Sequence, residues 1–248
     1  PRDFSDVDGQ YIGADKQVHR AENFKYRTIF SGWDVFRSQF PLQTLINPEI
    51  VNDEINSLIQ MASLSGKEYF PRWEIMNSYS GCMIGNPAVS VVVDAYEKGI
   101  RNFDIEKAFQ YSKNSVDTFS NGSLGFTPGN LSETLEYAYF DWCLGRFAES
   151  LGKKDIAEVY YAKGQAYKNN WNPEVKWFQS RNADGSWMDW KGKLMHGQGC
   201  VESNPFQQGW FVPHDLDGLS NLMGKEFLSK ELVNFFESTN TSYEVNSK

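Results

Sequence analysis

The sequence has few cysteines, no long apolar run and no cluster of basic residues. Cys82, Cys143 and Cys200 are too few and too far apart for a disulfide framework or a zinc site, so we expect them to be buried thiols. No apolar stretch approaches the ~20 residues that a membrane-spanning helix needs, so no membrane partner is expected. The 24 Lys and Arg residues are scattered and the net charge is −8. That pattern gives no positive stripe for phosphates, so no nucleic-acid partner is expected.

Two further patterns are absent. A run of acids near the N-terminus suggests a calcium loop, but counting from Asp6 puts Tyr11 where such a loop needs Gly and Gln17 where it needs Glu. No repeat of fixed period is visible. The chain begins at Pro1 rather than at Met and has no signal-peptide pattern, so we expect it to have been cut from a longer protein.

Aromatic residues make up 15% of the chain, with eight Trp and twelve Tyr. This surplus fits flat ligands that stack on rings, and it fits a large aromatic core equally well. The hydrophobic content of 40% is enough for a sizeable core. Composition therefore indicates a globular protein and leaves both explanations of the aromatics open.

Residues 200–215 are the most informative stretch. They hold two acids, a histidine, three side-chain amides and three large aromatics. Pro205, Gly209 and Pro213 interrupt them, so they cannot form one continuous helix or strand. Mixed donors and acceptors beside aromatic rings suit a sugar, although many such loops are only connections between elements.

Apolar spacing and capping residues predict a mainly helical chain. We expect a loop-rich entry over residues 1–30, then helices that begin near Trp33 and Asn47, helices over 87–98, 104–116, 155–168, 216–223 and 225–237, and a long helix capped by Asn130. Between residues 175 and 191 we expect a hairpin that pairs Trp177-Phe178 with Trp187-Met188. Residues 238–248 are expected to be a frayed polar tail.

Helices paired through loops, with one inserted β-hairpin, are typical of an all-α solenoid or toroid of helical hairpins. Asp34 and Arg37 lie three residues apart and would share a face of the first turn after Trp33. That pair is either an exposed ion pair or part of a ligand site.

Six blocks along the chain together carry a more specific signal. They are residues 4–9; 30–37 with Pro41-Leu42; 70–73; 81–83 with Pro87-Ala88; 132–139 with Asp141-Trp142; and 202–204 with Gln207 and 212–215. In this order they resemble the motifs of glycoside hydrolase family 92, and they cover nearly the whole chain. The resemblance implies a calcium-dependent, inverting exo-α-mannosidase whose catalytic domain is an (α/α)6 toroid.

The resemblance also implies roles for individual residues. Glu202 takes the position of the general acid, and Asn204 and Gln207 take positions near the metal, Ca²⁺. The residues implied to lie near the terminal mannose are Trp33, Asp34 and Arg37. Trp73, in the block of residues 70–73, is a further candidate to bind the sugar, and His214 is either a sugar ligand or a residue that holds its loop through a backbone hydrogen bond. The three aromatics that follow Glu202 are expected to desolvate it and so to favour its protonated form.

Two positions depart from the family pattern, and two motifs are missing. Ser203 stands where the family usually has Gly, and Gln208 stands where it has an aromatic residue. The later motifs, including the one that supplies the general base, are absent. We therefore expect residues 1–248 to be the front part of the catalytic domain, truncated at both ends and of little activity alone. Within the chain, Asp34 and Asp215 are the alternatives for a base.

The leading hypothesis is thus an enzyme that removes terminal mannose from an α-mannoside glycan. A non-catalytic glycan-binding toroid module and another helical-toroid glycosidase are the alternatives. By resemblance to the family, the protein is expected to be secreted, periplasmic or on the cell surface.

Overall fold

The structure is a computed structural model that describes residues 1–245, with side chains described for residues 1–237. The chain forms two compact units, one of Pro1–Phe119 and Phe140–Tyr161, and one of Ser120–Tyr139 and Ala162–Lys248. Two helices, α6 (Leu131–Ser150) and α7 (Lys154–Lys163), contribute residues to both units. Within residues 1–245, no helix is both long enough and apolar enough to cross a bilayer.

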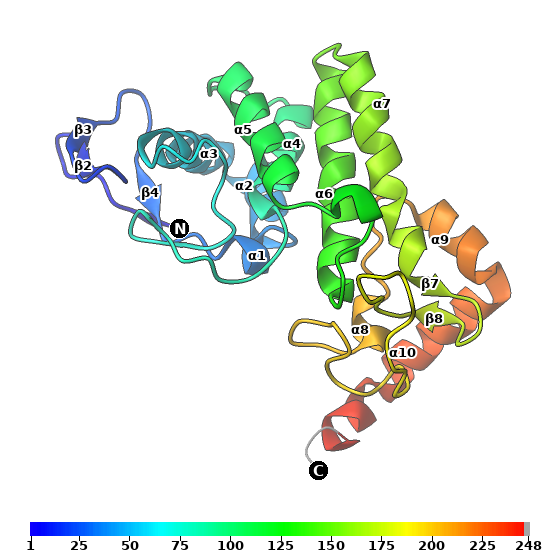
Figure 1. Cartoon of the computed structure of the whole chain (residues 1–248). Coiled ribbons are helices and arrows are strands. Elements are labelled where there is room, and N and C mark those ends of the chain that lie inside the picture. The colour runs from blue at the N-terminus through cyan, green and yellow to red at the C-terminus, as the bar shows by residue number, and fades with distance from the viewer. Residues whose placement is uncertain (246–248) are drawn as a thin grey trace. The chain divides into compact units, whose positions relative to one another are not determined.

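The first unit begins with short strands and continues as helices (Figure 1). Its elements are β1 (Arg2–Asp3), β2 (Gln10–Ile12), β3 (Val18–Arg20), β4 (Arg27–Thr28), α1 (Gly32–Val35), α2 (Gln39–Ile46), α3 (Pro48–Leu64), β5 (Glu74–Ile75), β6 (Ser78–Tyr79), α4 (Pro87–Glu97) and α5 (Ile105–Thr118). The strands pair antiparallel as β1 with β4, β2 with β3 and β5 with β6. The loop-rich entry expected over residues 1–30 is confirmed.

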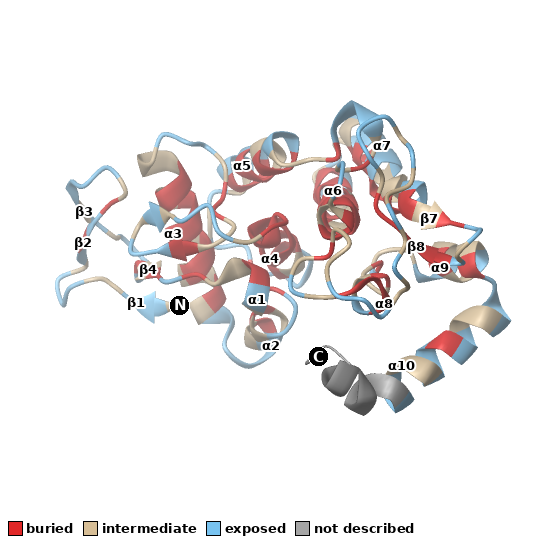
Figure 2. Cartoon of the chain, turned by 60° about the horizontal axis from the view of Figure 1, so that its bottom comes forward, coloured by how far each residue is buried: buried red, intermediate tan, exposed pale blue. Residues whose placement is uncertain are grey.

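Helix α4 lies at the centre of the first unit. Val89, Val91, Val92 and Val93 are all buried, and Figure 2 shows almost the whole helix in the buried colour. A helix with so wide an apolar surface has to be surrounded on most sides, and α4 contacts α1, α2, α3 and α5. The core of this unit is therefore organised around one valine-rich helix.

Local sequence signals set the helix starts. Asn47 accepts a hydrogen bond from the backbone N–H of Ile50, and Asp104 accepts one from Lys107. In the second unit Asn130 accepts one from Glu133. Each side-chain oxygen satisfies an amide that has no partner inside its helix. The starts of α3, α5 and α6 are confirmed.

Helices α6 and α7 form an antiparallel pair joined at Gly152, which has a positive φ of 74°. Where they cross within the first unit, a Cβ on Gly145 would lie 2.8 Å from a ring atom of Tyr161. A hydrogen side chain is needed at this position because the Tyr161 ring lies directly against the helix backbone. The predicted pairing of the helix before Gly152 with the helix after it is confirmed.

The second unit has a mixed set of short elements and one long helix. They are two 3-10 helices (Gly122–Leu124 and Gly164–Asn170), β7 (Trp171–Asn172), β8 (Trp177–Phe178), α8 (Pro205–Gln208), α9 (Leu216–Met223) and α10 (Lys225–Val245). Helix α10 continues to Val245. The prediction of a frayed tail over residues 238–248 is therefore wrong for residues 238–245. Residues 246–248 lie outside the described residues.

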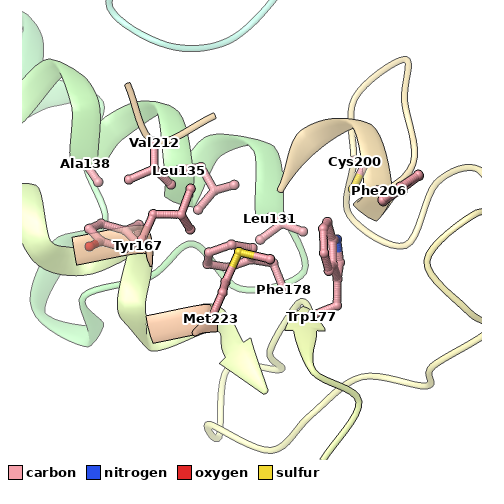
Figure 3. Close-up of a cluster of buried hydrophobic side chains, with 11 residues drawn as sticks. Leu131, Leu135, Ala138, Tyr167, Trp177, Phe178, Cys200, Phe206, Val212 and Met223 are labelled. Atoms are coloured by element: carbon pink, nitrogen blue, oxygen red, sulfur yellow. The ribbon is translucent and has the colours of Figure 1, made fainter. Parts of the chain in front are cut away.

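The second unit packs around Trp177, Phe178 and Tyr167, which are fully buried (Figure 3). They pack with Leu131, Leu135, Ala138, Cys200, Phe206, Val212, Leu219 and Met223. These side chains come from α6, the 3-10 helix Gly164–Asn170, β8, the 200–215 loop and α9. The aromatic surplus of the sequence thus supplies a core in this unit.

Two predictions are corrected here. Strand β8 pairs with β7, before it in the chain, and not with Trp187-Met188. The turn predicted at residues 182–185 is formed, with the Asn182 N–H donating to the Ser186 carbonyl at 2.8 Å and an isolated bridge between Arg181 and Trp187. Pairing with β7 buries the β8 side chains in the core. Among the three cysteines, Cys143 and Cys200 are buried as expected, but Cys82 is exposed.

Glu54, on α3, is a carboxyl group buried in the first unit. It is fully buried, its Oε1 accepts from Gln43 Nε2 at 3.4 Å, and its Oε2 has no hydrogen-bond partner among the described residues. Burial raises the pKa of Glu54 to about 7, from a usual 4.5. Between pH 4.5 and about 7, the folded protein therefore keeps the Glu54 proton that the unfolded chain has already lost.

Replacing Glu54 with Gln is expected to stabilise the protein at high pH. Because the folded pKa lies above the unfolded one, the wild type loses stability as the pH rises from 4.5 to about 7, whereas Gln cannot ionise. The gain in free energy of unfolding should approach ~3 kcal/mol at pH 8 and vanish near pH 4. Urea unfolding at both pH values measures it. Glu49→Gln, exposed on the same helix, is the control and should change stability by less than about 0.5 kcal/mol.

Candidate active site

The first unit brings together four of the predicted sugar-contacting residues. Trp33 is buried in α1, while Asp34 and Arg37 are exposed. Trp73 Nε1 donates to Asp34 Oδ2 at 3.1 Å. Arg37 Nη2 donates to the backbone carbonyl of Trp33 at 2.8 Å, and its guanidinium carbon lies 5.2 Å from the Trp33 ring centroid. Asp34 and Arg37 are thus held by separate partners rather than by each other.

Glu74 fixes the loop that carries Trp73. Its carboxylate is buried and accepts from Thr28 Oγ1 at 2.5 Å, from the Ile29 N–H at 2.9 Å and from the N–H groups of Phe30 and Asn77. Burial raises the pKa of Glu74, while these hydrogen bonds oppose that shift. The carboxylate joins β4 to the loop and so places Trp73 beside Asp34. Sequence patterns gave no sign of this role, because its partners are up to 46 residues away.

Gly32 allows the loop that carries Trp73 to lie close to the start of α1. A Cβ at this position would lie 2.6 Å from the carbonyl oxygen of Arg72 and 2.9 Å from the ring of Pro87. Any side chain would therefore push the loop away from the start of α1. The Gly-Trp-Asp sequence is built for this close contact, which keeps Trp33 and Asp34 near residue 73.

In the second unit, Ser132 anchors the loop that holds Glu202. Ser132 is fully buried near the start of α6. Its hydroxyl accepts from the Val201 N–H at 2.9 Å and donates to Gln208 Oε1 at 2.7 Å, and its backbone N–H donates to the Gly199 carbonyl at 3.1 Å. These bonds hold residues on both sides of Glu202. Sequence reasoning assigned no role to Ser132 beyond its place in a motif.

Glu202 itself is exposed, and its backbone is left-handed, with φ at 52°. The aromatic surroundings expected for it are not formed by this unit. Phe206 is buried in the core, and Trp210 and Phe211 pack against the same core. The expected desolvation by these rings is therefore wrong for the described residues, because the rings face inward. A left-handed non-glycine residue needs support from its neighbours, which Ser132 supplies.

The two departures from the family pattern contact each other. Ser203 Oγ lies 3.5 Å from Gln208 Oε1, the same oxygen that accepts from Ser132. An aromatic residue at position 208 could accept neither bond, and a glycine at 203 could donate none. The loop thus closes through side-chain hydrogen bonds at the two positions where the chain differs.

Asn204 and Gln207 form the cap of α8. Asn204 is buried; its Oδ1 accepts from the Gln207 N–H at 2.9 Å, and Gln207 Oε1 accepts from the Asn204 N–H at 3.2 Å. Asn204 Nδ2 donates to the Leu194 carbonyl at 3.2 Å. This reciprocal arrangement is a capping box. The structure therefore brings together the two residues predicted to lie near a metal.

The donor set fits calcium only in part. Calcium takes six to eight oxygen ligands, and each amide oxygen here keeps a second lone pair after its capping bond. Among the described residues, however, no three His, Cys, Asp or Glu side chains are grouped in a way that could hold a metal. Asn204 and Gln207 are of the right chemical type, but they supply no charge to offset a divalent ion.

His214 and Asp215 support the end of the 200–215 loop. His214 Nε2 donates to the Gly164 carbonyl at 2.8 Å, and its ring packs edge-on against Tyr167. Burial lowers the pKa of His214. Asp215 caps α9: Oδ1 accepts from the Gly218 N–H and Oδ2 from the Tyr167 hydroxyl, both at 2.8 Å. Burial tends to raise the pKa of Asp215, but these hydrogen bonds outweigh it and hold the pKa below its usual value.

Solved structures resemble this chain over most of its length. A family GH92 α-mannosidase from Bacteroides thetaiotaomicron is 32% identical with a TM-score of 0.89, covering 95% of this chain and 33% of its own. A family GH92 inverting mannosidase from the same organism is 36% identical with a TM-score of 0.87, covering 94% of this chain and 34% of its own. These likenesses confirm the all-α class and place the chain in an α/α-toroid fold of glycosidases.

The family follows from the sequence as a whole. The family model for the glycosyl hydrolase family 92 catalytic domain matches residues 1–248. The chain belongs to glycoside hydrolase family 92. An uncharacterized secreted glycosidase from Arthroderma benhamiae is 25% identical over 143 residues, which is 48% of this chain and 18% of that protein. The chain spans about a third of the length of the solved structures it matches.

Proposed function

We propose that the protein containing this chain hydrolyses terminal α-linked mannose from glycans with inversion of configuration. The observation that carries the proposal is the match of the family over the whole chain, together with relatives that are named mannosidases. One of them has also been solved in complex with mannoimidazole. The α-mannoside glycan is accordingly the proposed substrate. Secretion to the periplasm, the cell surface or the medium is proposed with it, supported by the secreted relative.

Glu202 is the proposed general acid. Inversion needs an acid that protonates the leaving oxygen and a base that activates water on the opposite face, about 6.5–9.5 Å away. Exposure leaves the Glu202 carboxyl accessible to substrate, and the Ser132 hydroxyl ties the Val201 N–H before it to the Gln208 side chain after it. Proton transfer from a positioned carboxyl contributes typically 10²–10⁴-fold to the rate.

Asp215 is poorly suited to act as the base. Its Oδ1 accepts from the Gly218 N–H as the cap of α9 and its Oδ2 accepts from the Tyr167 hydroxyl, so both oxygens hold the fold and protonating either would weaken one of these bonds. Asp34 is exposed and accepts a hydrogen bond from Trp73 through one oxygen only, which makes it the better candidate for the base within the chain. The family resemblance places the base after residue 248, and this is the assignment we propose.

The remaining residues are proposed to bind the sugar. Trp33 and Trp73 offer rings, and Asp34 and Arg37 offer a hydrogen-bond acceptor and donors. His214 is proposed as a further contact, with its ring fixed by the bond to Gly164. The first four already contact one another in the first unit, so they would bind as one preorganised group.

Calcium is proposed as the metal, with Asn204 and Gln207 contributing part of its shell. When bound, the ion would hold adjacent sugar hydroxyls and stabilise charge as the ring distorts. In this chain the capping box fixes both amide oxygens beside Glu202. The other ligands would come from water, sugar hydroxyls and residues elsewhere in the full-length protein.

Release of mannose from α-linked mannobiose by the full-length protein tests this proposal. We expect hydrolysis that falls at least 10²-fold after chelation with EGTA and returns on adding Ca²⁺, since the metal supports the transition state. Free mannose, quantified enzymatically, is the readout. Activity that survives chelation would contradict the calcium assignment. Binding of mannosides without any cleavage would favour a glycan-binding module instead.

A further inference from the structure

A polar hollow of about 590 Å³ lies in the second unit, beside the loop that carries Glu202. Its wall residues are Asn182, Trp187, Met188, Asp189, Lys191, Met195, His196, Gln198 and Gly199. This volume is in the range of ligand-binding pockets. Of these residues only Gly199 appears in the site described above, through its carbonyl bond to Ser132, and the sequence analysis gave none of them a function.

One side of the hollow is formed by the segment after β8. The Arg181 guanidinium lies 3.5 Å from the Trp187 ring centroid, and Arg181 itself donates to the carbonyls of Asn169 at 2.6 Å and Gly185 at 2.7 Å. The Met188 N–H donates to the Ser180 carbonyl at 3.0 Å. Trp187 is therefore held as a rigid, partly exposed ring.

The other side is a loop braced by Gln198. Its side chain accepts from the Lys191 N–H at 2.8 Å and donates to the carbonyls of Gly192 at 2.8 Å and Met195 at 3.0 Å. Ser180 Oγ donates to the Gln198 carbonyl at 2.7 Å. Three hydrogen bonds from one amide close this loop, so its shape is set before any ligand arrives.

This loop is tied directly to the segment of the proposed acid. The Gly197 N–H donates to the Ser203 carbonyl at 3.0 Å, the Phe206 N–H donates to the Lys193 carbonyl at 2.9 Å, and Asn204 Nδ2 donates to the Leu194 carbonyl at 3.2 Å. The hollow and Glu202 thus belong to one hydrogen-bonded framework. The residues that line the hollow are therefore close in sequence to Glu202, the residue proposed to protonate the leaving oxygen.

The chemistry of the walls selects a neutral, hydroxyl-rich ligand. Asp189 and His196 are exposed, and no hydrogen bond to either side chain is formed among the described residues. Lys191 and Asp189 both line the hollow, so its walls carry both signs of charge and favour neither an anion nor a cation. An aromatic ring with unpaired donors and acceptors around it matches a sugar, whose faces stack and whose hydroxyls take both roles.

We propose that this hollow binds a sugar of the leaving group, beyond the bond that is cleaved. The inference rests on the proposed function, because an enzyme that removes the terminal mannose leaves the rest of the glycan on the acid's side of the bond. Trp187 stacks on that sugar, and Asp189 and His196 bond its hydroxyls. The hollow thereby selects longer glycans over short ones.

The test compares substrates of increasing length in the full-length protein. We use α-mannosyl fluoride, which has no leaving-group sugar, and a linear α-linked mannotriose. Trp187→Ala should lower the ratio of kcat/KM for mannotriose to that for the fluoride about tenfold, the loss of roughly one stacking contact. Asp189→Asn should lower it about threefold. Glu174→Gln, exposed in the same unit and equally charge-neutralising, is the control and should leave the ratio unchanged.

A binding measurement separates this proposal from the proposed function. Calorimetric titration of mannotriose into Glu202→Gln protein should give a Kd that rises about tenfold when Trp187→Ala is added. Wild-type protein that cleaves neither substrate would contradict the mannosidase assignment, and the titration would then be made on wild type. An unchanged Kd and an unchanged ratio in both hollow variants would contradict the proposal that the hollow binds a sugar. Equal losses in the Glu174→Gln control would contradict it as well.

Discussion

Glu202→Gln in the full-length protein is expected to lower kcat for α-mannobiose by about 10³-fold, within the range for loss of a general acid. Gln keeps the size of the side chain and removes its proton. The loop should stay in place, because its hydrogen bonds run through Ser132, Gln208 and backbone groups on either side of residue 202. The effect therefore isolates chemistry from folding.

The leaving group gives this prediction a second readout. Fluoride departs without protonation, so hydrolysis of α-mannosyl fluoride by Glu202→Gln should fall less than about tenfold while hydrolysis of mannobiose collapses. Glu174→Gln should leave both rates unchanged. Steady-state kinetics on the two substrates suffice. An equal loss on both would point to damaged structure, and retention of mannobiose hydrolysis would remove Glu202 from the acid role.

Trp177→Ala is expected to cost about 4 kcal/mol of stability, as the truncation of a buried aromatic does. Trp177 is 1% exposed, packs against Phe206 and Trp210 at centroid distances of 5.3 and 5.4 Å, and donates from Nε1 to the Pro205 carbonyl at 2.6 Å. It is thus the contact that joins β8 to the first residue of α8. Its loss leaves a cavity and frees the segment that follows Glu202.

Two variants and a local probe make this prediction specific. Trp177→Phe keeps most of the packing and loses the N–H, so it should cost only about 1–2 kcal/mol. Phe236→Ala removes a ring that is 72% exposed and should cost less than about 0.5 kcal/mol. Denaturant unfolding gives the free energies, and hydrogen exchange of amides 205–212 locates the change. A cost below 1 kcal/mol for Trp177→Ala would show that other contacts hold α8.

Sequence reasoning succeeded where the signal is local. Asn47 with Pro48, and Asn130 with Glu133, cap their helices as predicted, because a cap depends on residues within one turn. Pro205 and Gly209 correctly indicated an irregular loop, which holds a single helical turn. The apolar run of α4 predicted a helix, and its extensive burial follows from contacts with four neighbouring helices, while Asp94 and Glu97 keep part of their exposure.

Failures occurred where the partner is distant. Trp177-Phe178 could pair with Trp171-Asn172 before it or with Trp187-Met188 after it. Its pairing with Trp171-Asn172 is set by packing in the core, which the local sequence does not show. Glu74 and Ser132 act through residues 46 and up to 76 positions away, so no spacing rule could find them. The aromatics after Glu202 were expected to surround it, but Phe206, Trp210 and Phe211 pack in or against the core of the second unit, where burying large rings adds to stability.

The roles of the site residues rest on the family resemblance, and the structure adds how their neighbours hold them. Trp33, Asp34, Arg37 and Trp73 form one contact group, and Asn204 with Gln207 forms another. What sequence could not foresee is that the two amides proposed to bind the metal are also the cap of α8. A cation bound there would use the second lone pair of each amide oxygen, which would couple the proposed metal to the helix that follows Glu202.

The most direct test of the proposed function follows the hydrolysis of methyl α-mannobioside by the full-length protein with proton NMR from the first turnovers, because the leaving sugar then stays a methyl glycoside and the only free mannose is the one whose anomeric bond is cleaved. Inverting removal of a terminal α-mannose predicts that β-mannose appears first and that α-mannose grows in only by mutarotation. Initial release of α-mannose would contradict the mechanism. Absence of any mannose release, with Ca²⁺ present, would contradict the proposed function itself.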